Sequence, residues 1–318
     1  MASALVVGDI HVGPEQRVMQ VVEAPIAGHT VKVPVIAING KRDGPRVAIT
    51  GGVHGAEYVG IEAARRLGTE IDPADVAGSL IVVPIANTVA FHKRSIYTSG
   101  LDDNNLNRLF PGNPHGTASE VLASWLFQTI IRPSQYYIDL HGGDMVEALI
   151  PFVIYLESED KQVETRSLAM ARATGIPRVI RGVTHGSTYA AATAAGIPAI
   201  LSEIGGQGVW SDTLVEQHKE GALRVLRHLN VLPGPSLPPT DNQRVYDTFA
   251  WMGAEVAGLF HPTVKVGDIV QVGQPMGCIT DYFGTEQQRI EASTYGEIVF
   301  LVTSLAMNVG DPLLAIGH

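Results

Sequence analysis

Short apolar runs, separated by longer segments in which apolar residues recur at helical spacing, are the main pattern along the chain. Four of the runs are rich in Val, Ile and Ala, as buried strands are, and they lie at residues 46–50, 79–85, 136–140 and 199–202. Because strands and helices alternate, the sequence predicts an α/β fold with a mostly parallel or mixed sheet flanked by helices.

The helical segments are predicted from apolar residues that recur every three or four positions. They are residues 59–67, 121–131, 160–173 and 212–229. Thr117 and Glu120 form a capping box that marks the start of the second of these helices. Near the N-terminus, strand-like runs such as residues 30–38 are expected to add edge strands to the sheet.

The composition changes at residues 232–239, a proline-rich segment that is typical of a stiff linker. Short β-like runs with frequent glycines follow it, at residues 264–268, 269–272, 277–280, 296–302 and 313–316. Val-Gly-Asp occurs at 266–268 and again at 309–311, which suggests two similar halves. We therefore expect a large domain over residues 1–232, where the candidate catalytic residues described below lie, and a small all-β domain over residues 241–318.

Polar residues follow the four predicted strands. His54, Asn87, His141 and Glu203 each lie at or just beyond the carboxyl end of a strand. Ligands of open α/β sheets bind along this edge, so residues that are distant in sequence should meet in one cleft.

Gly51-Gly52-Val53-His54-Gly55-Ala56-Glu57 places a histidine and a glutamate at a strand-to-helix turn, where both can bind one metal ion. His141, in Asp139-Leu140-His141-Gly142-Gly143, supplies a third ligand. Two imidazoles and one carboxylate leave a fourth position open, as in hydrolytic zinc sites, although the same ligands also accept other metals. The alternative for His54 and Glu57 is a turn histidine beside an acid that the helix dipole favours.

Three further groups of residues are candidates for roles in catalysis or in substrate binding. Glu203 ends an apolar strand, where an acid needs either an ion-pair partner or a role as general base and acid. Asn107 and Arg108 lie in a polar segment and together suit a carboxylate, unless they are simply part of a surface loop. Asp139 could orient the imidazole of His141 or approach the metal-bound water. The alternative is a structural role at the end of its strand.

Composition excludes several classes of protein. A net charge of −10, with no basic cluster, argues against a nucleic-acid partner. The single cysteine, Cys278, leaves no intramolecular disulfide and fits a reducing compartment. Without a recognisable secretory signal or a long apolar run, no membrane partner is expected, and we expect a cytoplasmic protein.

The motifs G-G-x-H-G-x-E, N-x-N-R-x-F-P-G, D-L-H-G-G and S-E-I-G-G occur in this order over residues 45–210. In this the chain resembles the succinylglutamate desuccinylase/aspartoacylase family, which is related to the zinc carboxypeptidases. The resemblance implies one zinc ion on His54, Glu57 and His141, and Glu203 as general base and acid. It further implies that Asn107 and Arg108 hold a substrate carboxylate and that Arg94 polarises the scissile carbonyl.

The chain is most similar to bacterial members that deacylate small amino-acid derivatives, such as acetyl-diaminobutyrate deacetylases. Its C-terminal part resembles a biotinyl/lipoyl-like barrel-sandwich, but residues 281–292 lack the lysine of a carrier domain. That part is therefore expected to be a fixed wall of the cleft or a surface for homo-oligomerisation.

The leading hypothesis is a zinc-dependent amidohydrolase that acts on the linear amide of a small N-acyl amino acid or related carboxylate. One rival is a zinc carboxypeptidase that acts on peptide C-termini. The other is a non-catalytic protein that binds a metal or a ligand.

Overall fold

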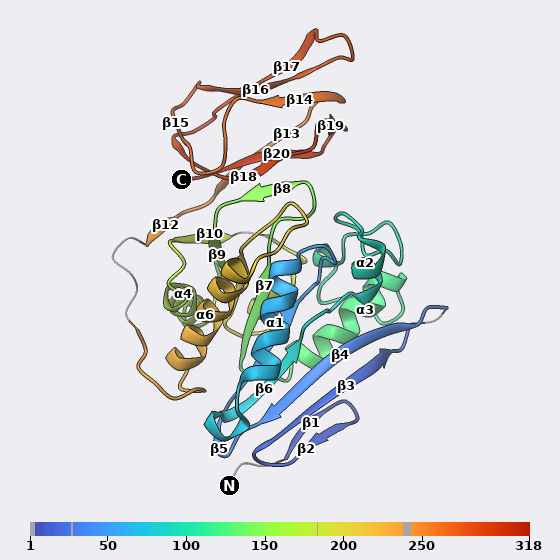
Figure 1. Cartoon of the computed structure of the whole chain (residues 1–318), viewed down its shortest axis with the longest axis vertical. Helices are drawn as coiled ribbons and strands as arrows, with labels where there is room; N and C mark the ends of the chain where they lie inside the picture. Colours follow the sequence, from blue (N-terminus) through green and yellow to red (C-terminus); the bar gives the residue numbers. More distant parts are fainter. Residues whose placement is uncertain (1–3, 27, 183, 238–242) are drawn as a thin grey trace.

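A nine-stranded mixed sheet forms the centre of the molecule (Figure 1). The computed structural model describes residues 4–26, 28–182, 184–237 and 243–318. In the order in which they pair, the strands are β12 (Arg244–Tyr246), β10 (Arg178–Gly182), β9 (Phe152–Leu156), β11 (Ala199–Glu203), β7 (Tyr136–His141), β5 (Arg42–Gly51), β6 (Ala77–Val83), β4 (Val31–Asn39) and β3 (Gln16–Ala24). The four neighbours β11, β7, β5 and β6 are parallel, so their carboxyl ends share one edge.

Helices cover both faces of this sheet because its buried strands are apolar on both sides. On β5, Val47 and Ile49 face one core cluster and Ala48 faces the other. The first face is covered by α1 (Tyr58–Glu70), α4 (Lys161–Ala173) and α6 (Asp212–His228). The second face is covered by α3 (Ala118–Leu126), the π-helical turn η3 (Phe127–Ile131), α5 (Thr188–Ala194) and the hairpin of β1 (Leu5–Val7) and β2 (Ile10–Val12).

The C-terminal segment forms two antiparallel sheets that lie beside the carboxyl-end edge (Figure 1). One contains β13 (Phe249–Gly253), β20 (Pro312–Gly317), β18 (Gly296–Val302) and β15 (Ile269–Val270); the other contains β17 (Glu286–Glu291), β16 (Pro275–Thr280), β14 (Gly258–Pro262) and β19 (Ala306–Met307). The short strand β8 (Glu147–Leu149) pairs with β18. Conversely, β12 follows the linker but pairs with β10. Each side of the expected domain boundary thus contributes one strand to a sheet of the other.

The two Val-Gly-Asp segments have the same local structure. Gly267 and Gly310 have φ angles of 88° and 89°, and each lies in a turn that leads into a strand. In both turns the aspartate, Asp268 or Asp311, accepts a hydrogen bond from the backbone N–H three residues earlier. The expectation of a strand over residues 264–268 is therefore wrong, because the glycine φ angle makes a turn. The two turns are alike, whereas the suggestion of two similar halves stays a prediction.

Most of the expected elements are present. The four predicted strands correspond to β5, β6, β7 and β11, and the predicted helices to α1, α3 with η3, α4 and α6. The run at residues 30–38 corresponds to β4, which is paired on both sides. The expectation that this run forms an edge strand is therefore wrong, and β3 forms the edge. The sequence analysis did not identify β9, β10 and α5. The predicted linker ends, and the predicted second domain begins, within residues 238–242, which lie outside the described residues.

The remaining helices are short: η1 (Pro73–Asp75), α2 (Thr88–Lys93) and η2 (Leu106–Arg108). In the part of the chain that the structure describes, no helix has both the length and the apolar character needed to cross a membrane.

Candidate metal centre

The turn after β5 brings His54 and Glu57 to the carboxyl-end edge of the sheet. Gly52 has a φ of 64°, a backbone angle that residues other than glycine rarely adopt. A Cβ on Gly55 would lie 2.1 Å from the backbone nitrogen of Phe91, so only glycine fits there. The turn then delivers Glu57 as the residue that precedes the first turn of α1.

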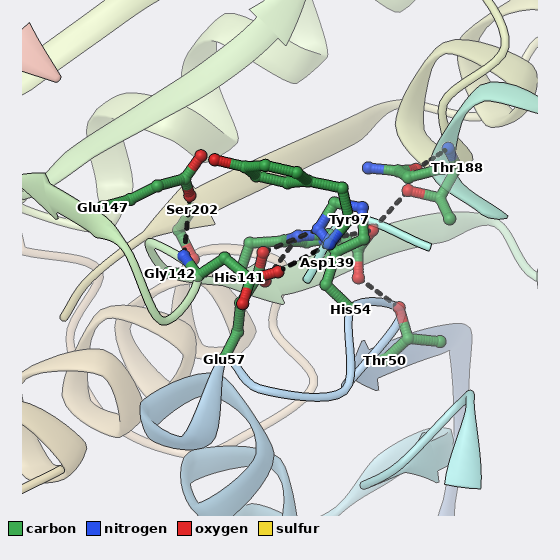
Figure 2. A network of polar contacts seen from close by, with 12 residues as sticks. Thr50, His54, Glu57, Tyr97, Asp139, His141, Gly142, Glu147, Thr188 and Ser202 are labelled. Carbon is green, nitrogen blue, oxygen red and sulfur yellow. Dashed lines mark hydrogen bonds and ion pairs between the residues drawn. The ribbon is translucent and has the colours of Figure 1, made fainter. Parts of the chain in front are cut away.

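The carboxylate of Glu57 lies between the two histidines (Figure 2). Its Oε1 is 2.6 Å from His54 Nδ1, and its Oε2 is 2.8 Å from His141 Nδ1. One ligand atom from each of the three residues lies within 4.8 Å of the others. Such a set of convergent nitrogen and oxygen donors fits a divalent metal ion, with zinc the commonest choice for two imidazoles and a carboxylate.

The opposite nitrogen of each imidazole has an acceptor of its own. His141 Nε2 is 2.9 Å from Asp139 Oδ2, and His54 Nε2 is 3.0 Å from Asn105 Oδ1. These acceptors hold the proton on Nε2 and leave the lone pair on Nδ1, which is the arrangement that a metal ligand requires.

Asp139 is itself held in place. The hydroxyls of Thr50 and Thr188 donate to its two carboxylate oxygens, and its side chain is fully buried (Figure 2). Because both oxygens are already engaged, Asp139 is suited to orienting His141 rather than to accepting a proton from water.

The pKa shifts of the three candidate ligands are those expected of a site that binds a cation. Burial would raise the pKa of Glu57, but His141 and His54 outweigh it and lower that pKa to about 2. Burial would lower the histidine pKa values; instead they are raised, by Glu57 for His54 and by Asp139 and Glu57 for His141. Positive charge is thus favoured between these groups, and a metal must compete with protons for them.

Glu203 lies next to the presumptive ligands because of strand register. In the parallel pair of β11 and β7, its Cα partner is His141. Its Oε2 atom is buried and has no hydrogen-bond partner among the described residues. Burial, followed by repulsion from Glu57, raises its pKa well above the usual range. A carboxylate with a raised pKa and a free oxygen beside a metal centre can accept a proton from water.

A cavity of about 390 Å³ opens over these groups. His54, Glu57, His141 and Glu203 line it, and so do Asn107 and Arg108. Asn107 is buried, with its Oδ1 accepting from the Thr188 N–H at 3.0 Å. Arg108 Nη1 donates to the Asn107 carbonyl at 2.8 Å. The structure therefore brings six of the seven expected site residues together.

Arg94 lies elsewhere. It is exposed, it ends α2 with a φ of 53°, and it lines a separate hollow with Tyr58 and Trp210. Asn87 also stays outside the cavity lining: it is buried and caps α2 by accepting from the Ala90 N–H at 3.1 Å. Asn87 therefore has a structural role, whereas the role expected of Arg94 stays a prediction.

Other cavity residues were missed by the sequence analysis. They come from a loop, from β8 and from the C-terminal sheet, and include Tyr97, Glu147, Phe249, Trp251 and Phe300. One local signal existed, since Tyr97 lies in a turn-rich stretch just before the Asn107 motif. The others have no motif, because strand pairs in the C-terminal sheet, β8 with β18 and β13 with β20, bring them to the cavity.

A family model covers most of the large sheet. The model of the succinylglutamate desuccinylase/aspartoacylase catalytic domain matches residues 43–229. Among curated proteins, the N-alpha-acetyl-L-2,4-diaminobutyric acid deacetylase of Halomonas elongata is 30% identical over 297 residues, which cover 91% of this chain and 86% of that protein.

Solved structures of similar proteins extend over almost the whole chain. The product-bound ectoine utilization protein EutE (DoeB) of Ruegeria pomeroyi has a TM-score of 0.86 at 26% identity, covering 99% of this chain and 98% of its own. A succinylglutamate desuccinylase/aspartoacylase of Rhodobacter sphaeroides has a TM-score of 0.83 at 27% identity, covering 95% of both chains. The likeness therefore includes the C-terminal sheets as well as the large sheet.

Proposed function

Since the chain belongs to the succinylglutamate desuccinylase/aspartoacylase family, whose members named above are amide hydrolases, we propose that it is a zinc-dependent deacylase of a small N-acyl amino acid or related carboxylate. The observation that carries the proposal is the position of Glu203. Its Oε2 atom has no hydrogen-bond partner in the described part of the chain. Glu203 is the strand neighbour of His141 and lines one cavity with His54, Glu57 and His141, a cluster that fits a metal ion.

The three candidate metal ligands and Glu203 have different roles in the proposed reaction. A zinc ion held by His54, Glu57 and His141 would supply a Lewis acid that polarises the acyl carbonyl and acidifies water. Glu203 accepts the proton of the attacking water on its carboxylate and then donates it to the leaving nitrogen. Its raised pKa suits both steps, because the group must take up a proton and hold it until the amide bond breaks.

Asn107 and Arg108 hold the other end of the substrate. The guanidinium of Arg108 lines the cavity beside the buried amide of Asn107, and such a fork binds carboxylate through two hydrogen bonds. Fixing the carboxylate in this way orients the acyl carbonyl for attack. Arg94, expected to polarise the acyl carbonyl, lines a separate hollow in this structure, so that role stays a prediction.

The C-terminal sheet limits the size of the substrate. Phe249, Trp251, Phe300 and Pro312 form one wall of the cavity. A cavity of about 390 Å³ suits a small molecule better than an extended peptide. The names of the similar proteins agree with this inference, since one is a deacetylase of acetylated diaminobutyric acid.

The test is a panel of N-acyl amino acids and short peptides assayed with the zinc-loaded protein. We expect acyl release from several small N-acyl amino acids, and a kcat/KM for peptides at least about tenfold lower. Preferential hydrolysis of peptides at their C-termini would make the protein a carboxypeptidase. Ligand binding without any turnover, in protein shown to hold zinc, would make it a binding protein.

A further inference from the structure

One side of the cavity contains an acid that the proposed mechanism does not use. In the pairing of β8 with β18, Leu149 lies opposite Phe300 and Glu147 opposite Val302. Glu147, Leu149 and Phe300 all line the cavity, because side chains two positions apart on a strand share a face. Figure 2 shows Glu147 and Thr188, which holds Asn107, on opposite sides of the ligand cluster.

Glu147 has no counter-charge in the described part of the chain. Its exposed fraction is 9%, and none of the ion pairs found there includes it. Oε2 accepts from the backbone N–H of Asp144 at 2.6 Å, and the hydroxyl of Tyr97 lies against the same carboxyl group. Burial, with a contribution from Glu57, raises the pKa of Glu147 to about 7. A buried acid in this state is stabilised by any cation that binds beside it.

Aromatic rings complete this side of the cavity. Phe249, Trp251 and Phe300 form a chain in which neighbouring ring centroids are 5.6 and 5.2 Å apart, and all three line the cavity. Aromatic faces attract ammonium groups through their quadrupoles, and they exclude water that would weaken an ion pair. A carboxylate, a phenol and aromatic faces around one space are the chemistry of a site for an organic cation.

We propose that Glu147, Tyr97 and the aromatic residues Phe249, Trp251 and Phe300 form a cation subsite that binds a free ammonium group of the substrate. The preferred substrates are then N-acyl amino acids with a second, unacylated amine, held by Arg108 at the carboxylate and by Glu147 at the ammonium. This inference rests on the proposed function. The alternative role for Glu147 is structural, since its carboxylate also closes the turn at Asp144.

The test compares two substrates of the same shape, Nα-acetyl-2,4-diaminobutyrate, whose side chain ends in an ammonium group, and N-acetylnorvaline, whose side chain ends in a methyl group. The parent protein should prefer the first in kcat/KM by at least about tenfold, as expected for a charged hydrogen bond. Glu147→Gln keeps the size and the acceptor for the Asp144 N–H but removes the charge. It should abolish most of the preference by acting mainly on the cationic substrate.

Glu157→Gln is the matched control. Glu157 follows β9, which runs antiparallel to β11, so it lies at the far edge of the sheet from the cavity, and its only ion pair in the described part of the chain is with Arg181 at 3.6 Å. This variant makes the same change in net charge and should leave the preference intact. A parent protein that hydrolyses both substrates equally, or a Glu147→Gln variant that is equally impaired on both, would overturn the cation subsite.

Binding measurements separate this inference from the proposed function. Calorimetry with free 2,4-diaminobutyrate and free norvaline needs no turnover. Tighter binding of the diamino acid by the parent, lost in Glu147→Gln, supports the subsite even if neither acylated substrate is hydrolysed, in which case only the proposed function fails. Equal affinity of the parent for both amino acids refutes the subsite whatever the enzyme hydrolyses.

Discussion

The two sides of the cavity are built in different ways. The metal side consists of residues at the ends of β5, β7 and β11, held by strand register within one sheet. The opposite wall consists of side chains from β8, β13 and β18, which meet because β8 pairs with a strand of the C-terminal sheet. The metal side is suited to chemistry that family members share, whereas the wall is suited to selecting one substrate among many.

This comparison predicts that substitutions on the metal side stop the reaction, whereas substitutions in the wall change which substrate is used. Glu203→Gln is expected to have the largest effect. It keeps the size of the side chain but removes the base, so kcat should fall by at least ~10²-fold while zinc content stays unchanged. Steady-state kinetics with elemental analysis of the same sample measure both quantities. A kcat within a few-fold of the parent would assign the proton transfer to another group.

The next effect concerns the residue that fixes the substrate carboxylate. Arg108→Lys keeps the charge but loses the planar fork, so kcat/KM should fall by roughly 10- to 1000-fold, or about 1.4 to 4 kcal/mol. An analogue with an amide in place of the carboxylate should be a poor substrate for both proteins. Arg132→Lys, an exposed residue after η3, is the control. If parent and Arg108→Lys treat both substrates alike, Arg108 does not bind the carboxylate.

Trp251→Ala should separate the two sides of the cavity most clearly. Trp251 contributes to the wall, but its exposed fraction is 57%, so we expect KM to rise only about three- to tenfold. Zinc content should not change, because the candidate metal ligands lie at the carboxyl-end edge of the large sheet, on the other side of the cavity. Phe283→Ala, at the exposed tip between β16 and β17, serves as a control. Loss of zinc in Trp251→Ala would show that the two sides are not independent.

The last effect is on stability rather than activity, and it arises behind the sheet edge. His218 on α6 is buried, 2.6 Å from the Ser202 hydroxyl, and burial, with a contribution from His141, lowers its pKa from 6.5 to about 3. The unfolded chain therefore binds a proton that the folded protein does not, so stability falls as pH drops below 6.5. Between pH 6.5 and 5 the protonation of this group in the unfolded chain should lower the free energy of unfolding by about 1.6 kcal/mol.

Urea unfolding of parent and His218→Gln at several pH values measures this contribution. The free energy of unfolding of the variant should depend less steeply on pH than that of the parent, by up to about 1.4 kcal/mol per pH unit in this range. Identical slopes would mean that His218 is not held neutral in the folded protein.

The same difference between the two sides of the cavity explains which of its residues could be predicted from the sequence. His54, Glu57, His141 and Glu203 were identified because short strands, glycine turns and a two-residue period place them at one sheet edge. Glu147 carries no such signal, because its position depends on a strand pair between residues that are about 150 positions apart. Arg94 was expected at the site from resemblance alone, and the local backbone directs it to another hollow.

The C-terminal half shows the same limit within a single motif. Val-Gly-Asp marks two similar turns, but the apolar residues around 264–268 suggested a strand where Gly267 makes a turn. β9 and β10 were missed although β11, which is also five residues long, was predicted. In β10 only Val179 and Ile180 are apolar, so this strand is recognisable mainly by its partners in the sheet.

The most direct test of the account is the zinc content of the parent protein and of His141→Ala after purification and exchange into metal-free buffer with a measured amount of zinc. The three convergent ligands predict about one zinc per chain in the parent. Removing His141 takes away one ligand and leaves β7 in place, so the variant should retain much less zinc and lose deacylase activity. Full zinc occupancy in His141→Ala, or none in the parent, would contradict the assignment of the metal centre.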